Sequence, residues 1–219
     1  MTRRDEDLDH IRALLLRMCV RAESMVRVAA RGVAERDLAL ARSIGGADTE
    51  LDRLETEIDR EVVASLARFP ARGEELRALV VALKIVTEVE RIGDHAVNLA
   101  DRAIDLGQGP GMEPGFEFPA MAEVALGMIR SATSAFALRD TAMARSVIER
   151  DDEVDELHRV GLERLALAAA SAPDQANRAF RLSNMLRQVE RIADHAVRVA
   201  QLVIFLVEGA DVRHGRLTT

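Results

Sequence analysis

Aromatic residues are scarce in this sequence. It has six phenylalanines and neither tryptophan nor tyrosine, so Phe, Trp and Tyr together make up 3% of the chain. A β-sheet core favours aromatic and β-branched side chains. The core must therefore consist of Leu, Val, Ile, Ala and Met, a composition that suits helices packed on helices and favours an all-α fold.

Cysteine occurs once, as Cys19. A single cysteine excludes a disulfide within the chain and any metal site built from several thiolates. Cys19 lies in an apolar stretch with helical periodicity, and no residue near it in the sequence would activate a thiol. We therefore expect a buried structural thiol.

Long apolar runs and positive charge are also lacking. The longest apolar run covers residues 202–207, far fewer than the ~20 residues of a membrane-spanning helix, and residues 1–9 lack the apolar segment of a signal peptide. The formal net charge is −7, which excludes the basic surface that nucleic-acid binding requires. We expect a soluble, cytoplasmic protein without membrane insertion or direct nucleic-acid binding; any control of genes would act through a protein partner.

What is present is helical periodicity along nearly the whole chain. Hydrophobic residues make up 48% of the sequence and recur with the spacing of one helix face. This pattern predicts six helices, with Asp37 as an N-cap and a bend or short break at Gly45-Gly46 in the second. Their expected ranges are 6–34, 37–68, 73–106, 119–138, 140–171 and 174–208.

A cluster of glycine and proline at residues 107–115 is the one linker-like stretch, and it lies at the midpoint of the chain. We expect residues 109–115 to join two domains, 1–108 and 116–219. Short turns between helices make neighbours antiparallel. The predicted fold is therefore an all-α pair of tandem antiparallel three-helix bundles.

The two halves repeat one another. Residues 89–97 read Val-Glu-Arg-Ile-Gly-Asp-His-Ala-Val, and residues 189–197 differ from them only by Ala in place of Gly. A repeat of this length at a spacing of 100 residues indicates an internal duplication. The duplicated feature is a Glu-x-x-x-Asp pair on a helix.

The acids of this pair are predicted to lie away from the core. The apolar stripe through Val89, Ile92 and Ala96 must face the bundle interior, which places Glu90 and Asp94 on an outer or lateral face. The second and fifth predicted helices carry acids at the same spacing. Across the chain, the candidate metal ligands are Asp48, Asp52, Glu90, Asp94, Asp151, Asp155, Glu190 and Asp194.

Two interpretations of these acids compete. Like charges four residues apart destabilise a helix by a few tenths of a kcal/mol, and facing carboxylate pairs on adjacent helices can form an oxygen-rich cation site. Carboxylates alone suit Mg²⁺, Mn²⁺, Ca²⁺ or iron better than a structural Zn²⁺ site. The alternative is a plain solvated surface, and spacing alone does not choose between the two.

Histidine and arginine accompany both acid pairs. His95 and His195 directly follow the aspartates, so their side chains point about 100° away from them. This favours a supporting role behind the ligands or a lateral contact over direct ligation. Arg91 and Arg191 could pair with acids on neighbouring helices.

The residues of segment 89–98, their repeat, the midpoint linker and the two sets of three helices resemble the PhoU family, regulators of phosphate uptake in bacteria and archaea. The resemblance covers nearly the whole chain. It implies a tandem pair of three-helix bundles that carry multinuclear iron or zinc clusters at the (Glu/Asp)-x-x-x-Asp motifs, the eight acids named above. Strict repeat symmetry fails where Asp101 becomes Gln201 and Glu55 becomes His158, so the two sites need not be equivalent.

The resemblance further implies a non-enzymatic negative regulator. Members of the family damp the phosphate ABC transporter and a sensor histidine kinase when phosphate is plentiful. They act through protein contacts and usually as homodimers, so the implied partners are the transporter ATPase and the kinase. The sequence itself contains no Gly-rich phosphate-binding loop.

Two other functions remain open at this point. One is a carboxylate-bridged metalloprotein, either a di-iron-type enzyme or a metal store, because helix bundles rich in Glu and Asp also build these. Such proteins direct Glu-x-x-His ligands into the bundle core, whereas the acids here are predicted opposite the apolar stripe. The other is a scaffold whose acidic rows only keep the surface soluble.

Overall fold

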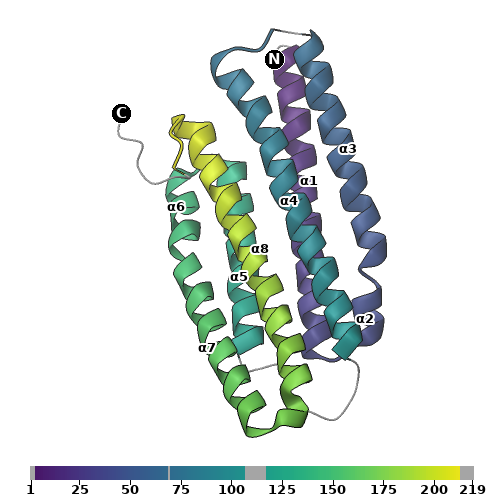
Figure 1. Ribbon diagram of the computed structural model, residues 1–219. Coiled ribbons are helices and arrows are strands. Elements are labelled where there is room, and N and C mark those ends of the chain that lie inside the picture. The colour runs from purple at the N-terminus through teal and green to yellow at the C-terminus, as the bar shows by residue number, and fades with distance from the viewer. Residues whose placement is uncertain (1–2, 69, 107–116, 213–219) are drawn as a thin grey trace.

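The computed structural model describes residues 3–68, 70–106 and 117–212, and over these residues the chain is helical without a β-strand (Figure 1). The predicted all-α class is therefore confirmed. The elements are α1 (Arg3–Ala34), α2 (Leu38–Arg42), α3 (Gly45–Arg68), α4 (Gly73–Leu106), α5 (Glu117–Leu138), α6 (Thr141–Glu149), α7 (Asp151–Ser171), the 3₁₀ turn η1 (Pro173–Gln175) and α8 (Ala176–Glu208).

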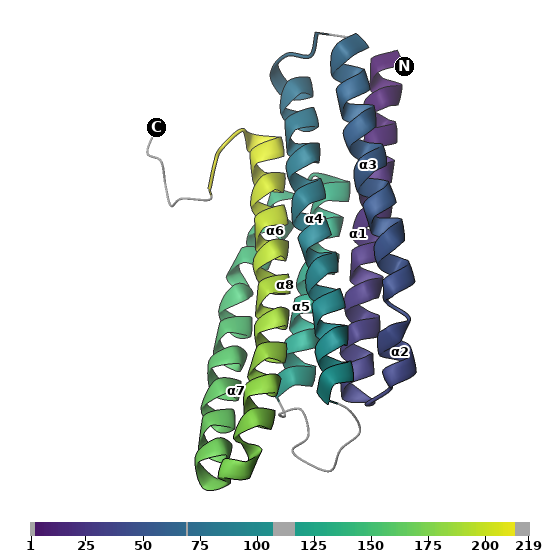
Figure 2. The same ribbon diagram turned by 45° about the vertical axis from the view of Figure 1, so that its right-hand side comes forward.

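The long helices form two antiparallel three-helix units that pack side by side. Helices α4 and α8 run antiparallel at the centre, α1 and α5 pack behind them, and α3 and α7 lie at the two outer edges (Figures 1 and 2). In each unit a short helix followed by a longer one, α2–α3 or α6–α7, takes the place of the middle helix. The predicted architecture of two tandem bundles is confirmed.

The same turn precedes the middle helix in both units. Arg36 and Arg139 adopt left-handed backbone conformations, with φ of 55° and 54°. The next residue is an aspartate whose carboxylate caps the following helix: Asp37 accepts from the backbone N–H groups of Ala39 and Leu40, and Asp140 accepts from that of Met143. These bonds satisfy amides that a helix start leaves without intrahelical partners, and the predicted cap at Asp37 is confirmed.

The middle helix is broken in both units, and only one break was expected. In the first unit α2 ends at Arg42 and α3 begins at Gly45, next to the predicted bend. In the second unit the predicted continuous helix over 140–171 is wrong, because α6 and α7 separate at Arg150. Neither glycine nor proline occurs at this position. Arg150 itself keeps right-handed dihedrals (φ −76°, ψ −10°).

One apolar core runs through both units. Its buried members come from all four central helices as well as from α3 and α7. Cys19 is 3% exposed, which confirms the predicted buried thiol, and its burial raises the thiol pKa to about 12. The predicted linker 109–115 lies outside the described residues, so the division into two domains stays a prediction.

None of the helices within the described ranges combines the length and apolar character that crossing a bilayer requires.

Candidate functional site

The acids predicted in the first repeat gather on the outer side of α3 and α4. They are Asp48 and Asp52 of α3 and Glu90 and Asp94 of α4. The two helices approach closely because Gly93 has no side chain; a Cβ at this position would collide with Leu51 of α3. This approach places the α3 carboxylates within electrostatic reach of those on α4.

Burial and mutual repulsion together raise the pKa values of two of these acids. Burial raises the pKa of Asp48, and the charges of Asp52 and of Asp94 on the neighbouring helix raise it further. Burial likewise raises the pKa of Glu90, together with the charge of Asp94, to about 7, although Arg91 acts in the opposite direction. At neutral pH this surface therefore holds a proton or attracts a cation more readily than separate carboxylates would.

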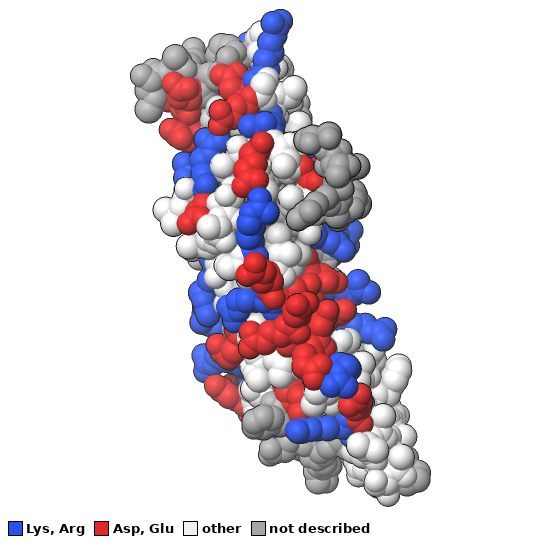
Figure 3. All heavy atoms as spheres, turned by 90° about the vertical axis from the view of Figure 1, so that its left-hand side faces the viewer, with Lys and Arg blue, Asp and Glu red and all other residues white. Residues whose placement is uncertain are grey.

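The second repeat forms a corresponding acidic patch on α7 and α8. Its predicted members are Asp151, Asp155, Glu190 and Asp194. Burial raises the pKa of Asp151 to about 6, and the charges of Asp155 and Asp194 add to the effect. Figure 3 shows carboxylates gathered about midway along this side of the molecule.

One further pair of positions distinguishes the two patches. Glu55 joins the first patch: burial raises its pKa, and the charges of Asp59, Asp52 and Asp94 raise it further. In the second repeat His158 occupies the corresponding position, and its Nε2 is buried without a hydrogen-bond partner among the described residues. The two patches therefore differ in charge at the position of Glu55 and His158, as the sequence predicted.

Arginine lies beside both acid pairs, but on the same helix. Arg91 contacts Glu90 and Asp94 at 3.6 and 3.2 Å, and Arg191 contacts Glu190 and Asp194 at 3.8 and 3.6 Å. Of the expected pairing with acids on neighbouring helices, the structure shows among the described residues only the charge of Arg91 acting on Glu55 of α3, whose pKa it lowers against the other causes. The three-residue spacing of both arginines from the aspartates lets them fold back along their own helix.

The donor set suits a metal ion in its chemistry but not in its arrangement. Hard cations prefer carboxylate oxygens, and burial together with the neighbouring carboxylates raises the pKa values here, so bound positive charge would be favourable. Yet across residues 3–68, 70–106 and 117–212 no three Asp, Glu, His or Cys side chains are placed to hold one ion. The metal role of the eight predicted acids stays a prediction.

The two duplicated histidines meet at the centre of the molecule. His95 of α4 and His195 of α8 stack with ring centroids 5.3 Å apart and planes 28° apart. His95 Nδ1 lies 2.9 Å from Gln188 Oε1, and His195 Nδ1 lies 2.7 Å from Glu88 Oε2. Of the two roles left open by the sequence, the lateral contact is the one observed.

These histidine contacts follow the repeat. Glu88 and Gln188 are 100 residues apart, as His95 and His195 are, so each histidine contacts the equivalent residue of the other half. Glu88 and Gln188 were not among the predicted site residues, because a cross-helix contact has no signature in local spacing. Burial lowers the pKa of His95, and the charge of His195 also disfavours its protonation.

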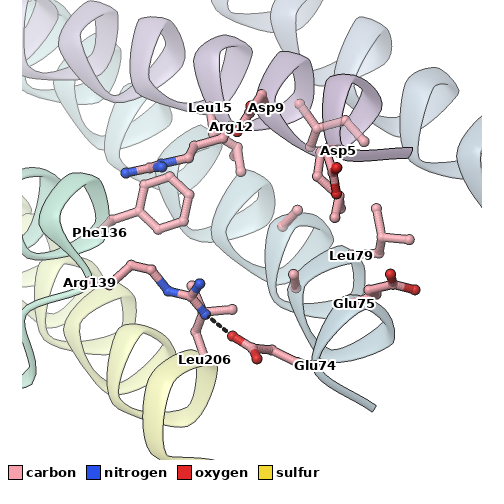
Figure 4. A pocket seen from close by; sticks show the side chains of 14 residues that line it. Asp5, Asp9, Arg12, Leu15, Glu74, Glu75, Leu79, Phe136, Arg139 and Leu206 are labelled. Carbon is pink, nitrogen blue, oxygen red and sulfur yellow. Dashed lines mark hydrogen bonds and ion pairs between the residues drawn. The ribbon is translucent and has the colours of Figure 1, made fainter. Parts of the chain in front are cut away.

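A cavity of about 320 Å³ opens at one end of the seam between the two units. Figure 4 shows its labelled side chains, which come from α1, α4 and α8 and from the end of α5 with the turn that follows. The floor is apolar and the mouth carries charges of both signs. Nothing in the sequence pattern pointed to it, since its walls are assembled from four separate stretches.

Comparison with known proteins gives one consistent result. The family model described as "PhoU domain" matches residues 15–103 and 118–203. A "Phosphate-specific transport system accessory protein PhoU homolog" of Pseudomonas aeruginosa is 35% identical over 213 residues, covering 97% of this chain and 88% of that protein. One of Aquifex aeolicus with the same description is 32% identical over 209 residues, covering 95% of each.

Two solved structures share the fold. The crystal structure of PhoU from Pseudomonas aeruginosa superposes with a TM-score of 0.89 at 33% identity, over 94% of this chain and 99% of the other. The phosphate transport system regulatory protein PhoU from Streptococcus pneumoniae gives a TM-score of 0.87 over 96% and 99%. Its identity is 19%, so this second likeness supports the fold alone.

Proposed function

The chain belongs to the PhoU family, and from this premise we propose that it is an accessory protein of phosphate transport that acts as a negative regulator of phosphate uptake and of phosphate-starvation signalling. The observation that carries the proposal is the identity of 35% with a phosphate-specific transport accessory protein across 97% of the chain. The likeness extends over both units, so it concerns the whole molecule and not one shared helix pair.

The regulation is proposed to act through protein contacts in the cytoplasm. The partners would be the ATPase of the phosphate ABC transporter, the sensor histidine kinase, or both, with the protein acting as a homodimer. A net charge of −7 fits a protein that works on other proteins and not on nucleic acid. The acidic patches on α3–α4 and α7–α8 give it two related surfaces for such contacts.

We favour a non-enzymatic adaptor over a carboxylate-bridged metalloenzyme because of where the acids lie. In di-iron bundle proteins the carboxylate and histidine ligands project into the bundle core. Here Asp52 and Asp155 are exposed, and the histidine nitrogens described above face Glu88 and Gln188. The interior between the helices is predominantly apolar, and Ser65, Glu117 and His195 are its buried polar residues among those described.

The acids can still bind cations at the surface, and this forms a second part of the proposal. The eight predicted carboxylates would hold the ion or cluster, and its charge would offset their mutual repulsion. Iron and zinc are the metals implied by the family, and Mg²⁺, Mn²⁺ or Ca²⁺ suit the oxygen donors. Since the carboxylates do not surround common points, their side chains would have to rotate towards the ion.

Metal analysis of protein purified without chelator tests this part, with the Glu90→Ala, Asp94→Ala double variant beside the wild type. Loss of metal from the variant alone supports the proposal. Equal metal content in both proteins, or none in either, contradicts it.

The regulatory role is tested in a deletion strain of the source organism. We expect alkaline phosphatase and the transporter to be expressed in phosphate-rich medium, where the wild type represses them, and a plasmid copy to restore repression. Normal repression in the deletion strain would show that the chain has another role. Co-purification with the transporter ATPase or the kinase then identifies the partner.

A further inference from the structure

The seam between α4 and α8 is packed differently at its two ends. At one end lies the cavity of about 320 Å³, whose lining includes Arg139 and Leu206 (Figure 4). The repeat places Arg36 and Leu106 at the corresponding positions of the other end, and the space that they line measures only about 10 Å³. A space of that size holds at most about one water molecule. The seam is therefore filled at one end and unfilled at the other.

The polar contacts across the seam also differ between equivalent positions. On the cavity side of the histidine pair, Glu88 accepts a bond of 2.7 Å from His195 and lies 3.7 Å from the guanidinium of Arg198. Gln188 and Asn98 occupy the equivalent positions in the other half. Neutral amides thus replace both members of the ion pair, so the repeat has no counterpart of this charged contact.

The burial of the two histidines follows the same difference. His195, whose partner is Glu88, is 7% exposed. His95 is half-buried, and its partner is the neutral amide of Gln188. A hydrogen bond to a carboxylate is roughly twice as strong as one between neutral groups, and it strengthens further where water is excluded. The stronger of the two histidine contacts therefore lies on the side of the unfilled end.

Two further contacts beside the cavity are polar as well. Glu74 pairs with Arg139 across the mouth (Figure 4). Arg77 donates to the carbonyl oxygen of Leu206 at 3.0 Å. Polar contacts near water can be exchanged for bonds to water at little cost. Because the cavity is already unfilled, parting the helices here also sacrifices few apolar contacts, so this end of the seam is the easier one to open.

We propose that Glu88, His195 and Arg198 form a latch on the seam, and that its release lets the two units part at the cavity end while the filled end remains closed as the pivot. In the released form the cavity widens, and α3 and α7 at the outer edges change their angle to each other. The two acidic patches lie on α3–α4 and α7–α8, so the latch sets their relative placement. This inference concerns motion within the chain and does not rest on the proposed function.

The filled end is suited to be the pivot. There Arg181 of α8 donates to the carbonyl oxygen of Asp105 of α4 at 2.8 Å, and Ala103 and Met185 line the small residual space. Parting the helices at this end would break close apolar contacts, whereas at the cavity end it mainly widens a space that exists already. Local opening of a fold occurs where the fewest packed contacts must be lost.

Thiol reactivity in the full chain tests the proposal. Ala82 lines the cavity and Ala103 lines the small space at the other end; both lie on α4, and they are 4% and 6% exposed. Each is replaced by cysteine in turn. The rate of reaction with a bulky fluorescent maleimide is followed at fixed pH by peptide mass spectrometry. The natural Cys19 is 3% exposed and serves in every protein as the internal reference for global unfolding.

The latch is removed by giving it the residues of the other half, Glu88→Gln with Arg198→Asn. In this background we expect Ala82→Cys to react about tenfold faster, because the cavity end opens more often once the charged contacts are lost. Ala103→Cys and Cys19 should keep their rates, since the pivot end and the centre stay closed. Both latch substitutions introduce residues that the fold already accepts at the equivalent positions.

The matched control makes the reverse exchange on the other side, Gln188→Glu with Asn98→Arg, and should leave the rate of Ala82→Cys unchanged. An unchanged rate of Ala82→Cys in the latch variant would overturn the proposal, and so would the same acceleration in the control. Equal acceleration of Ala82→Cys, Ala103→Cys and Cys19 would indicate global unfolding without a pivot. Acceleration of Ala103→Cys alone would place the mobile end opposite the cavity, which also contradicts the proposal.

Discussion

At the scale of single residues, Glu117 is the one buried carboxylate in the described part of the chain. It begins α5 and is only 3% exposed. Its Oε1 accepts a bond of 2.6 Å from Arg164 on α7, while its Oε2 is buried without a hydrogen-bond partner among the described residues. One guanidinium therefore compensates this carboxylate, and removing it would leave a buried charge unpaired.

Arg164→Met should lower the free energy of unfolding by about 2–3 kcal/mol, less than the roughly 3–5 kcal/mol of a fully buried pair, because Arg164 itself is largely exposed. Chemical denaturation followed by far-UV circular dichroism measures this. The control is Arg159→Met, which breaks exposed ion pairs on the same helix and should leave the midpoint nearly unchanged. Equal shifts for the two variants would show that Glu117 does not depend on Arg164.

The raised pKa of Glu90 predicts an unusual pH dependence. Folding raises this pKa from about 4.5 to about 7, so between these values the folded state holds a proton that the unfolded state has released. The free energy of unfolding should therefore rise as the pH falls from about 7 towards 5, and Asp151 contributes in the same direction below about pH 6.

Glu90→Gln should remove its part of this rise and make the protein more stable than the wild type at pH 8. Thermal melting in the presence of a chelator, from about pH 5 to about pH 8, measures the effect. Glu57→Gln, at a half-buried position of α3 outside the first acidic patch, serves as the control and should keep the wild-type slope. The same slope in Glu90→Gln as in the wild type would show that repulsion around Glu90 is weaker than its surroundings imply.

The sequence identified the acids but not their neighbours, for a physical reason. Residues four apart share a helix face, so Glu90 and Asp94 could be grouped from spacing alone. The link from Asp94 to Asp48 depends on how closely α3 approaches α4. The contact between His195 and Glu88 depends on the packing of α4 against α8, and neither distance is encoded locally.

At the scale of helices, most boundaries followed local signals, and the break at Arg150 did not. Proline, glycine and aspartate mark the ends of α3, α4 and α6 because they fix or cap the backbone. Between α6 and α7 no such residue occurs, and the break comes about one turn later in the repeat than that between α2 and α3, because α6 has 9 residues after its cap and α2 has 5. A broken middle helix is therefore common to both copies, whereas the position of the break differs and Gly45-Gly46 marks it in one copy alone.

Glycines at two helix positions should respond oppositely to a side chain. A Cβ at Gly46, in the first turn of α3, would meet no atom within 4 Å, whereas a Cβ at Gly93 would collide with Leu51. Gly46→Ala should raise the free energy of unfolding by about 0.5–1 kcal/mol. Gly93→Val should lower it by about 1–3 kcal/mol because α3 and α4 must separate.

Denaturant midpoints of the two glycine variants check this pair. Gly93→Val should also bring the pKa of Glu90 back towards its ordinary value, since separating α3 from α4 exposes Glu90 to water and moves the charge of Glu55 away from it. If Gly93→Val is as stable as the wild type, the close approach of α3 and α4 is not what assembles the first acidic patch.

At the scale of the whole molecule, duplication placed the repeated segment at a pseudo-twofold centre. α4 and α8 carry the repeated segments 89–97 and 189–197 and run antiparallel (Figure 1), so equivalent positions meet, as His95 and His195 do. The sequence indicated the duplication and the two bundles, and the Gly/Pro cluster between them predicted two separate domains. In the structure both halves contribute to one buried apolar cluster.

A shared core predicts that the protein unfolds in a single step. Leu54→Ala in α3 and Leu165→Ala in α7 remove buried side chains, 3% and 5% exposed, from opposite edges of the molecule. Each should lower the free energy of unfolding by about 2–4 kcal/mol. Because α4 and α8 bury their faces against each other, loss of one unit exposes the other, and both variants should melt in one transition.

Calorimetry is the suitable measurement, since the chain has no Trp or Tyr to report tertiary structure optically. A calorimetric enthalpy equal to the van't Hoff enthalpy in the wild type and in both variants would establish the single unit. Autonomous domains would instead give two transitions, with Leu54→Ala shifting only the one that belongs to residues 1–108. In that case the seam between α4 and α8 would be a weak interface, and either half could unfold while the other stays folded.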